Sequence, residues 1–128
     1  AVLSAAAGKT GMTFAVAFIK GVLCNFLVCI AVWMAFAAKT VPGKIIAVFF
    51  PVMLFVLCGF EHSIANMYYI PAGLFTVGDS AYGGLQAAPG LTWGNMFLKN
   101  LLPVTLGNIV GGSGLVGCGY WYAYHGKN

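Results

Sequence analysis

The residues most suited to chemistry in this sequence gather in one short stretch, Gly59–Met67 (GFEHSIANM). It contains Glu61 and His62, the only glutamate and one of the two histidines of the chain. Both follow an unbroken apolar run, Ile45–Phe60. An ionisable side chain is costly to place inside a bilayer, so it normally faces a pore or a polar partner there. The stretch therefore predicts a permeation site within a membrane, or, more simply, a polar pair that only holds helices together.

The composition indicates the class of protein in which Glu61 and His62 are placed. Hydrophobic residues make up 61% of the chain and charged residues only 6%, whereas about 25% of the residues in a soluble domain are charged. The chain is therefore predicted to be an all-α integral membrane protein. The net charge of +4 includes no arginine, which gives no support to nucleic-acid binding. The four cysteines lie in apolar stretches without a CxxC pair, so we interpret them as packing residues rather than as metal or redox sites. We expect no cofactor and no enzymatic activity.

Three apolar stretches predict three transmembrane helices in a single membrane domain, 1–128. They cover residues 11–38, 45–75 and 103–124. An unbroken helix over 45–75 would be about 46 Å long at ~1.5 Å per residue, against a hydrocarbon core of ~30 Å. We therefore expect this middle helix to be broken near 59–67. Two half-helices that meet inside a membrane expose free backbone groups and dipole ends, which can bind ions.

The third stretch carries small residues at a helical spacing. We expect a short surface helix at Phe97–Leu102, preceded by Thr92 as an N-cap, and then the third span. Small residues on one face let another helix approach closely. The predicted stripe consists of Gly107, Gly111, Gly114 and Cys118.

The distribution of charge predicts the orientation in the membrane. Lys39, Lys44 and Lys127 lie on one side, while the long loop 76–94 with Asp79 lies on the other. Positively charged residues favour the cytoplasmic side. The C-terminus is therefore expected in the cytoplasm, and the long loop outside.

Two other polar residues leave alternatives open. Asn25 lies near the middle of the first span, where an asparagine either bonds another helix or faces a pore. Lys9 precedes that span, where it either marks the membrane interface or attracts anions at a channel mouth. The residue types alone favour neither alternative.

Three spans with a broken middle helix correspond to half of a known transporter plan. Inverted-repeat transporters pair two such units and bind the substrate between their broken helices. No internal repeat is found in the sequence, and three helices alone cannot enclose Glu61 and His62. We therefore expect a missing N-terminal three-span half, in the same polypeptide or in a separate chain.

Three segments together resemble the formate/nitrite transporter family: Lys20–Ala35, Gly59–Met67 and Asn100–Gly112. The resemblance covers nearly all of this chain, but only the C-terminal half of a family member. It implies an aquaporin-like six-span inverted-repeat channel, whose second and fifth spans are broken, and to which this chain supplies the fourth to sixth. It also implies a homopentamer in the lipid bilayer of a bacterial or archaeal inner (plasma) membrane.

The resemblance also implies roles for the polar residues of the chain. His62 is similar to the central pore histidine, and Glu61 and Asn66 are similar to the polar residues that surround and fix it. Asn25 looks like the pore asparagine of the fourth span. Asn108 looks like a polar residue of the sixth span that helps to hold the network.

Three more residues are assigned to the outer part of the pore by the same resemblance. Phe55 and Val28 match apolar residues of the outer constriction, and Lys9 matches a basic residue near the outer vestibule. A bare anion that crosses an apolar ring loses hydration at high cost, whereas a neutral acid loses far less. We therefore expect a channel for formate, nitrite or hydrosulfide, in which Lys9 concentrates the anion and His62 shares a proton with it. The rival is simple anion conduction past a neutral His62.

Two other classes of membrane protein remain as alternatives. An aquaporin-type channel for neutral solutes would carry Asn-Pro-Ala boxes at its half-helix ends, whereas this string reads Ala65-Asn66-Met67. A haem-carrying subunit of a respiratory enzyme needs axial histidines that face one another. His62 is expected at mid-membrane and His125 beyond the third span, so this alternative fits less well.

Overall fold

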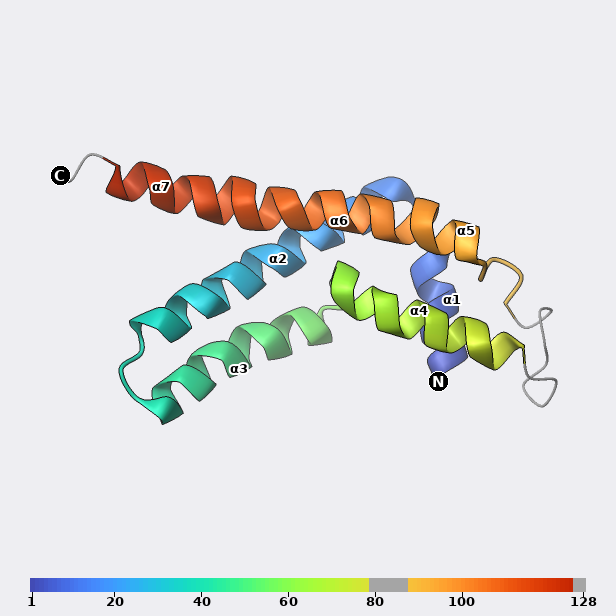
Figure 1. The fold of residues 1–128 in the computed structure, drawn as a ribbon, viewed down its shortest axis with the longest axis horizontal. Coiled ribbons are helices and arrows are strands. Elements are labelled where there is room, and N and C mark those ends of the chain that lie inside the picture. Colours follow the sequence, from blue (N-terminus) through green and yellow to red (C-terminus); the bar gives the residue numbers. More distant parts are fainter. Residues whose placement is uncertain (79–87, 126–128) are drawn as a thin grey trace.

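The structure, a computed structural model, describes residues 1–78 and 88–125. Asp79 and Lys127, on which the predicted orientation depends, lie outside the described residues. Figure 1 shows one long helix along the whole molecule, with shorter helices beside it. The shorter helices are α1 (Val2–Thr10), α2 (Phe14–Ala37), α3 (Val41–Leu57) and α4 (Ser63–Val77). The long helix consists of α5 (Trp93–Asn95), a π-helical turn (Met96–Leu101), α6 (Leu102–Ile109), a π-helical segment (Val110–Gly117) and α7 (Cys118–Tyr124).

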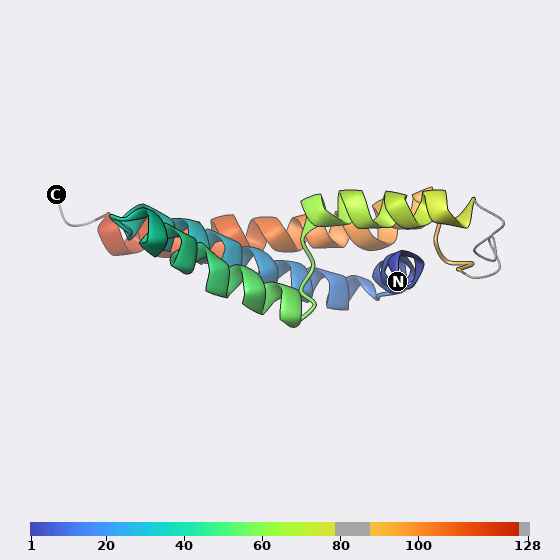
Figure 2. The same ribbon diagram turned by 90° about the horizontal axis from the view of Figure 1, so that it is seen from below.

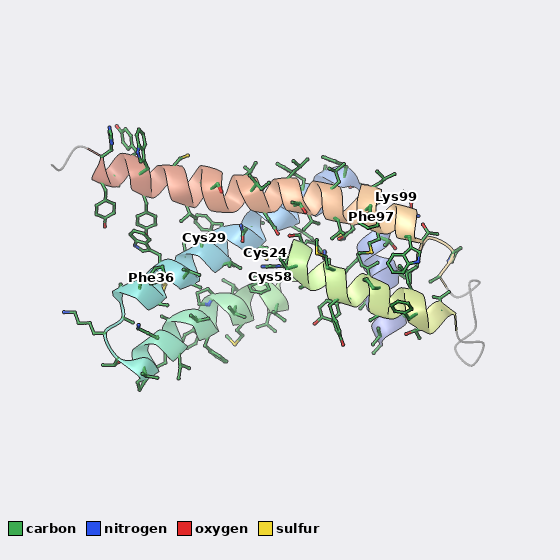
Figure 3. All side chains as sticks on the ribbon, in the orientation of Figure 1. Cys24, Cys29, Phe36, Cys58, Phe97 and Lys99 are labelled. Carbon is green, nitrogen blue, oxygen red and sulfur yellow. The ribbon has the colours of Figure 1, made fainter. Side chains whose placement is uncertain are left out.

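Within residues 1–78 and 88–125, two helices have the length and apolar character needed to cross a membrane. They are α2 and the long helix, Trp93–Tyr124, while α3 is also apolar but shorter, with 17 residues. Large apolar side chains are exposed along α2 and α3; Phe36, labelled in Figure 3, is 78% exposed, and Leu57 is 75% exposed. A surface of this kind suits lipid or another protein as its neighbour.

The segment between α3 and α4 divides the second apolar stretch into two helices. α3 is capped by Cys58, and Gly59 then adopts φ = 61°. Glycine adopts this left-handed conformation without steric cost, and it turns the chain out of the helix. The backbone is extended at His62, and α4 begins at Ser63. Figure 2 shows that this short segment carries the chain from the level of α3 to the level of α4.

The predicted surface helix at Phe97–Leu102 is wrong, because these residues belong to one helix of 32 residues, Trp93–Tyr124. A boundary at Pro103 is a reasonable expectation, since proline has no N–H to donate and its ring clashes with the preceding turn. A π-helical turn directly precedes this proline, and it closes with the N–H of Leu102 on the carbonyl of Phe97. Because the π turn already shifts the hydrogen-bond register, the helix continues through the proline.

Glycines hold α2 and the long helix in close contact. A side chain at Gly107 would collide with the Phe18 carbonyl, and one at Gly111 would collide with the backbone of Val22. On α2, a side chain at Gly21 would come within 2.7 Å of a carbonyl oxygen of the long helix. The first half of the predicted stripe is therefore confirmed as a helix contact.

The second half of the predicted stripe is wrong. Gly114 and Cys118 are exposed, and Gly112 instead packs against the Asn25 side chain. The prediction assumed 3.6 residues per turn, whereas Val110–Gly117 is π-helical and has i→i+5 hydrogen bonds. The changed register rotates the later residues away from α2.

We expect Gly111→Ala to lower the free energy of unfolding by about 1–3 kcal/mol, because the new methyl group overpacks the contact with α2. Gly119→Ala is the matched control, since among the described residues its added methyl group meets no atom within 4 Å apart from its chain neighbours and the adjacent backbone of its own helix. This control should be neutral or stabilising, because alanine is favoured over glycine in a helix by ~1 kcal/mol. Thermal unfolding in detergent measures the difference, and equal midpoints for the two variants would contradict the close contact.

A small buried cluster fixes α1 against α4 (Figures 1 and 2). Ala6 fills the space beside Gly73, where a side chain could not be accommodated. Ile70 and Leu91 are almost fully buried in the same cluster. As a result, the C-terminal end of α1, which carries Lys9, reaches the break between α3 and α4.

Candidate functional site

The break carries a buried carboxylate whose charge is paired. Glu61 is 4% exposed, and the Nζ of Lys9 lies 2.9 Å from its Oε1 and 3.1 Å from its Oε2. Asn66 donates a hydrogen bond to Oε2 at 2.6 Å, and Asn100 donates to the same oxygen at 3.4 Å. A buried charge is tolerated when it is paired and hydrogen-bonded. Glu61 and Lys9 therefore form a neutral pair inside a cage of amide donors.

Lys9 reaches this pair from α1. Its side chain is 20% exposed, and its Nζ lies 5.8 Å from the centroid of the Tyr69 ring, within cation–π range. Its backbone carbonyl accepts a hydrogen bond from Asn100 at 2.9 Å. The family resemblance implies a place for Lys9 near the outer vestibule, whereas its nearest partner in the structure is the carboxylate of Glu61. The ammonium group thus already has a counter-ion within the chain.

Asn108 ties the backbone of the break to two helices. Its Nδ2 donates to the carbonyl of Gly21 at 2.8 Å and to the carbonyl of Glu61 at 3.0 Å. Its Oδ1 accepts from both the N–H and the hydroxyl of Ser63, each at 3.1 Å. Its own carbonyl accepts from Asn25 at 2.7 Å. The start of α4 is therefore held against α2 and the long helix by one side chain.

His62 lies directly before α4 and is half-buried. Its side chain makes no capping hydrogen bond, and its ring centroid lies 6.3 Å from that of Phe55. Its Nδ1 is buried and has no hydrogen-bond partner among the described residues. Val28, the other residue predicted at the constriction, is half-buried on α2. His62 thus keeps hydrogen-bonding capacity that this part of the chain does not use.

The site lies in the middle of the molecule, where α2 passes the end of α3. Figure 3 labels Cys24 on α2 and Cys58 at the end of α3, and both mark this region. The N–H of Glu61 donates to the carbonyl of Lys20 at 3.3 Å, which fixes the break against the same part of α2. The site is therefore positioned by four segments, namely α1, α2, the start of α4 and the long helix.

The structure joins most of the predicted polar residues in one hydrogen-bonded network. Sequence reasoning missed Asn100 and Ser63, which belong to the same network. Asn100 is an amide two helical turns before Asn108 in an apolar segment, which is a signal in the sequence, but the predicted surface helix places it outside the third span. The roles of all these residues in permeation remain predictions. The predicted residues in the network are Lys9, Asn25, Glu61, Asn66 and Asn108.

The two histidines of the chain lie in different parts of the molecule. His62 is at the break, whereas His125 follows α7 at the C-terminal end of the long helix (Figure 1). The His125 ring stacks on Trp121, with the ring centroids 4.4 Å apart. The structure thus does not bring the two imidazoles together in the way that a pair of axial haem ligands requires.

The sequence is similar to a family of membrane transporters over almost its whole length. Residues 1–122 match the family described as formate/nitrite transporter. A probable formate transporter of Methanothermobacter thermautotrophicus is 49% identical over 121 residues, which cover 93% of this chain and 40% of the relative. The formate channel FocA of Escherichia coli (strain K12) is 42% identical over 135 residues, which cover 99% of this chain and 47% of the relative. The chain therefore spans less than half the length of these relatives.

The helical fold is similar to that of a solved channel. A structure described as a pentameric formate channel with formate bound matches with a TM-score of 0.89 and 38% sequence identity. The match covers 97% of this chain and 51% of the channel chain. Because the family match extends over residues 1–122 and the fold agrees with it, the chain belongs to the formate/nitrite transporter family.

Proposed function

We propose that this chain, together with a second half of comparable size, forms a membrane channel for small monovalent anions, with formate as the first candidate. The relatives named as a formate transporter and a formate channel support this substrate class. The fractions of these relatives that the chain spans, 40% and 47%, support the need for a second half. The observation that carries the proposal is the Lys9–Glu61 pair, with its buried carboxylate, beside His62 at a break between two apolar helices.

His62 is the residue proposed to meet the anion. It directly precedes α4, and the N-terminal end of a helix carries a partial positive charge that favours anions. The nearby Phe55 ring offers no compensating hydrogen bond, and a bare anion is costly to dehydrate. We therefore assign to His62 the donation of a proton or a hydrogen bond, so that the anion crosses in a nearly neutral form. Nitrite and hydrosulfide are small monovalent anions too, and are included among the substrates.

The Lys9–Glu61 pair is proposed to control the charge around His62. An unpaired Glu61 would repel an anion, and an unpaired Lys9 would retain it, because Coulomb interactions are strong in a medium of low dielectric constant. Because the two opposite charges lie only 2.9 Å apart, their electric fields largely cancel farther from the pair. Lys9 keeps 20% of its side chain exposed, which is compatible with the predicted attraction of anions from outside.

The other predicted residues are assigned to the walls and the frame of the pore. Phe55 and Val28 are proposed to form the apolar constriction, and both are half-buried. The frame is proposed to consist of the amide side chains whose hydrogen bonds fix the break, namely Asn25, Asn66 and Asn108.

The assembly and location are also part of the proposal. The similar solved structure is described as pentameric, which supports a homopentamer. Relatives from an archaeon and a bacterium support the plasma membrane of such an organism. Lys39, between α2 and α3, and Lys44, in the first turn of α3, support a cytoplasmic position for this end of the two helices. The C-terminus is proposed to lie on the same side.

The test is anion flux into liposomes that contain the assembled channel. We define the assembled channel as this chain co-expressed with the part of the Methanothermobacter relative that it does not match. Formate, nitrite and hydrosulfide uptake should each rise with an inward proton gradient. His62→Asn should remove most of this dependence, because asparagine cannot exchange a proton.

The control is His125→Asn, which changes the histidine at the far end of the long helix. It should leave the flux and its dependence on the gradient unchanged. Anion flux that depends neither on the proton gradient nor on the His62→Asn change would contradict proton sharing and favour simple anion conduction. Rapid water or glycerol flux without anion flux would instead favour a channel for neutral solutes.

A further inference from the structure

We infer that Asn100, to which no role is assigned by the sequence or the relatives, is a positioning residue for both charges at the break. The inference rests on the proposed function. Asn100 is 0% exposed, and it lies in the π-helical turn at the start of the long helix, next to Lys99, which Figure 3 labels. Its amide contacts both members of the ion pair: the backbone carbonyl of Lys9 at 2.9 Å and the Oε2 of Glu61 at 3.4 Å.

The contact with Lys9 fixes the end of α1. The Lys9 carbonyl belongs to the last turn of this helix, where carbonyl groups lack intrahelical partners. Asn100 satisfies this carbonyl by donating from its Nδ2. The same side chain therefore holds the segment that delivers the ammonium group and contacts the carboxylate that receives it.

The hydrogen-bond partners of Asn100 determine the orientation of its side-chain amide. This amide in turn determines the orientation of the Asn66 amide. A backbone carbonyl and an ionised carboxylate only accept hydrogen bonds, so Asn100 must direct its Nδ2 toward Lys9 and Glu61. Its Oδ1 then faces Asn66, whose Nδ2 donates to it at 2.7 Å. The same Nδ2 donates to Glu61 at 2.6 Å. Asn100 thus fixes the direction of each amide hydrogen bond around the carboxylate.

The experiment exchanges the negative charge between positions 61 and 100 in the assembled channel. Asn100→Asp removes both donated bonds and adds a negative charge beside Glu61, while Glu61→Gln removes the negative charge that pairs with Lys9. Formate flux per assembled channel should fall in each single variant by about tenfold or more, the factor expected for one hydrogen bond to a charged group. The double variant keeps one negative charge within the same cage, and its flux should recover well above that of either single variant.

Two controls separate positioning from general stability. Asn95→Asp makes the same change in the turn where Thr92, as predicted, caps the helix by accepting from the Asn95 N–H at 3.1 Å. It should leave the flux per channel unchanged, because among the described residues its side-chain amide donates only to an exposed loop carbonyl, that of Gly90. The amount of assembled pentamer, measured separately, detects variants that simply fail to fold.

Wild-type flux in Asn100→Asp, or a double variant no better than Glu61→Gln, would overturn the inference. If Asn100→Asp does not assemble, the formate flux of the double variant is compared with that of Glu61→Gln alone, and this comparison still tests the inference. A loss in Asn100→Asp that is confined to the amount of pentamer, with normal flux per channel, would reduce Asn100 to a folding role and overturn the inference as well. Failure of the proposed function is recognised separately, since the wild-type assembled channel itself would then carry no anion.

Discussion

Lys9→Met is expected to lower the free energy of unfolding of the assembled channel by about 3–5 kcal/mol, the cost of removing one partner from a buried ion pair. The side chain of Glu61 is only 5% exposed, so its carboxylate cannot recover the lost interaction from water. The two amide donors that remain, Asn66 and Asn100, are neutral. Anion flux should be nearly abolished in the same variant, because an unpaired negative charge beside His62 repels the permeating anion.

The double variant Lys9→Met/Glu61→Gln tests the same argument from the other side. It removes both charges, and replacing a whole buried pair costs much less than breaking it. Thermal unfolding should therefore place its midpoint between those of Lys9→Met and the wild type. Lys44→Met is the matched control, because Lys44 is exposed at the start of α3. Equal midpoints for Lys9→Met and Lys44→Met would contradict a buried pair of this strength.

The centre of the site could be predicted because its residues are rare in their surroundings. Glu61 and His62 are ionisable groups after a long apolar run, and polar groups in such places require a partner or a pore. Asn25 and Asn108 stand out in apolar segments for the same reason. These polar residues could therefore be recognised from the composition of the chain, and the position of the break from the length limit that a bilayer sets on a helix.

The partners of these residues could not be predicted in the same way. Lys9 and Glu61 are 52 residues apart in the chain. The sequence alone does not show which segments that far apart lie next to each other in space. The ion pair depends on the short helix α1 and on the packing of Ala6 against Gly73. Small residues such as these allow many helix contacts, so the sequence does not choose among them.

The π-helical parts of the long helix account for the two errors in the predicted fold. A 3.6-residue period selects Gly114 for the helix contact, whereas the structure uses Gly112. A helix boundary at Pro103 likewise hides Asn100, which lies in the π turn before it. The energy of a π turn depends on the packing around it and not on a local residue pattern, so periodicity alone cannot detect it.

Asn108→Leu is expected to be the second most damaging change, with a loss of about 3 kcal/mol or more in the free energy of unfolding. Leucine has a similar size but no polar atoms, so it leaves the N–H of Ser63 and the carbonyls of Gly21 and Glu61 without this partner. Each buried polar group that loses its hydrogen bond costs ~1–3 kcal/mol. The break between α3 and α4 should then open locally before the whole protein unfolds.

Hydrogen–deuterium exchange of the assembled channel measures this opening directly. In Asn108→Leu, exchange should rise at residues 58–66 and stay unchanged in α7, because α7 makes no hydrogen bond with Asn108 in the described chain. Ser113→Ala is the control, since it removes a hydroxyl group from the exposed side of the same long helix. If exchange rises equally along the whole chain in Asn108→Leu, its amide contributes to global stability only. If exchange does not rise at all, the hydrogen bonds of Asn108 do not hold the break, and the framework proposed around His62 is wrong.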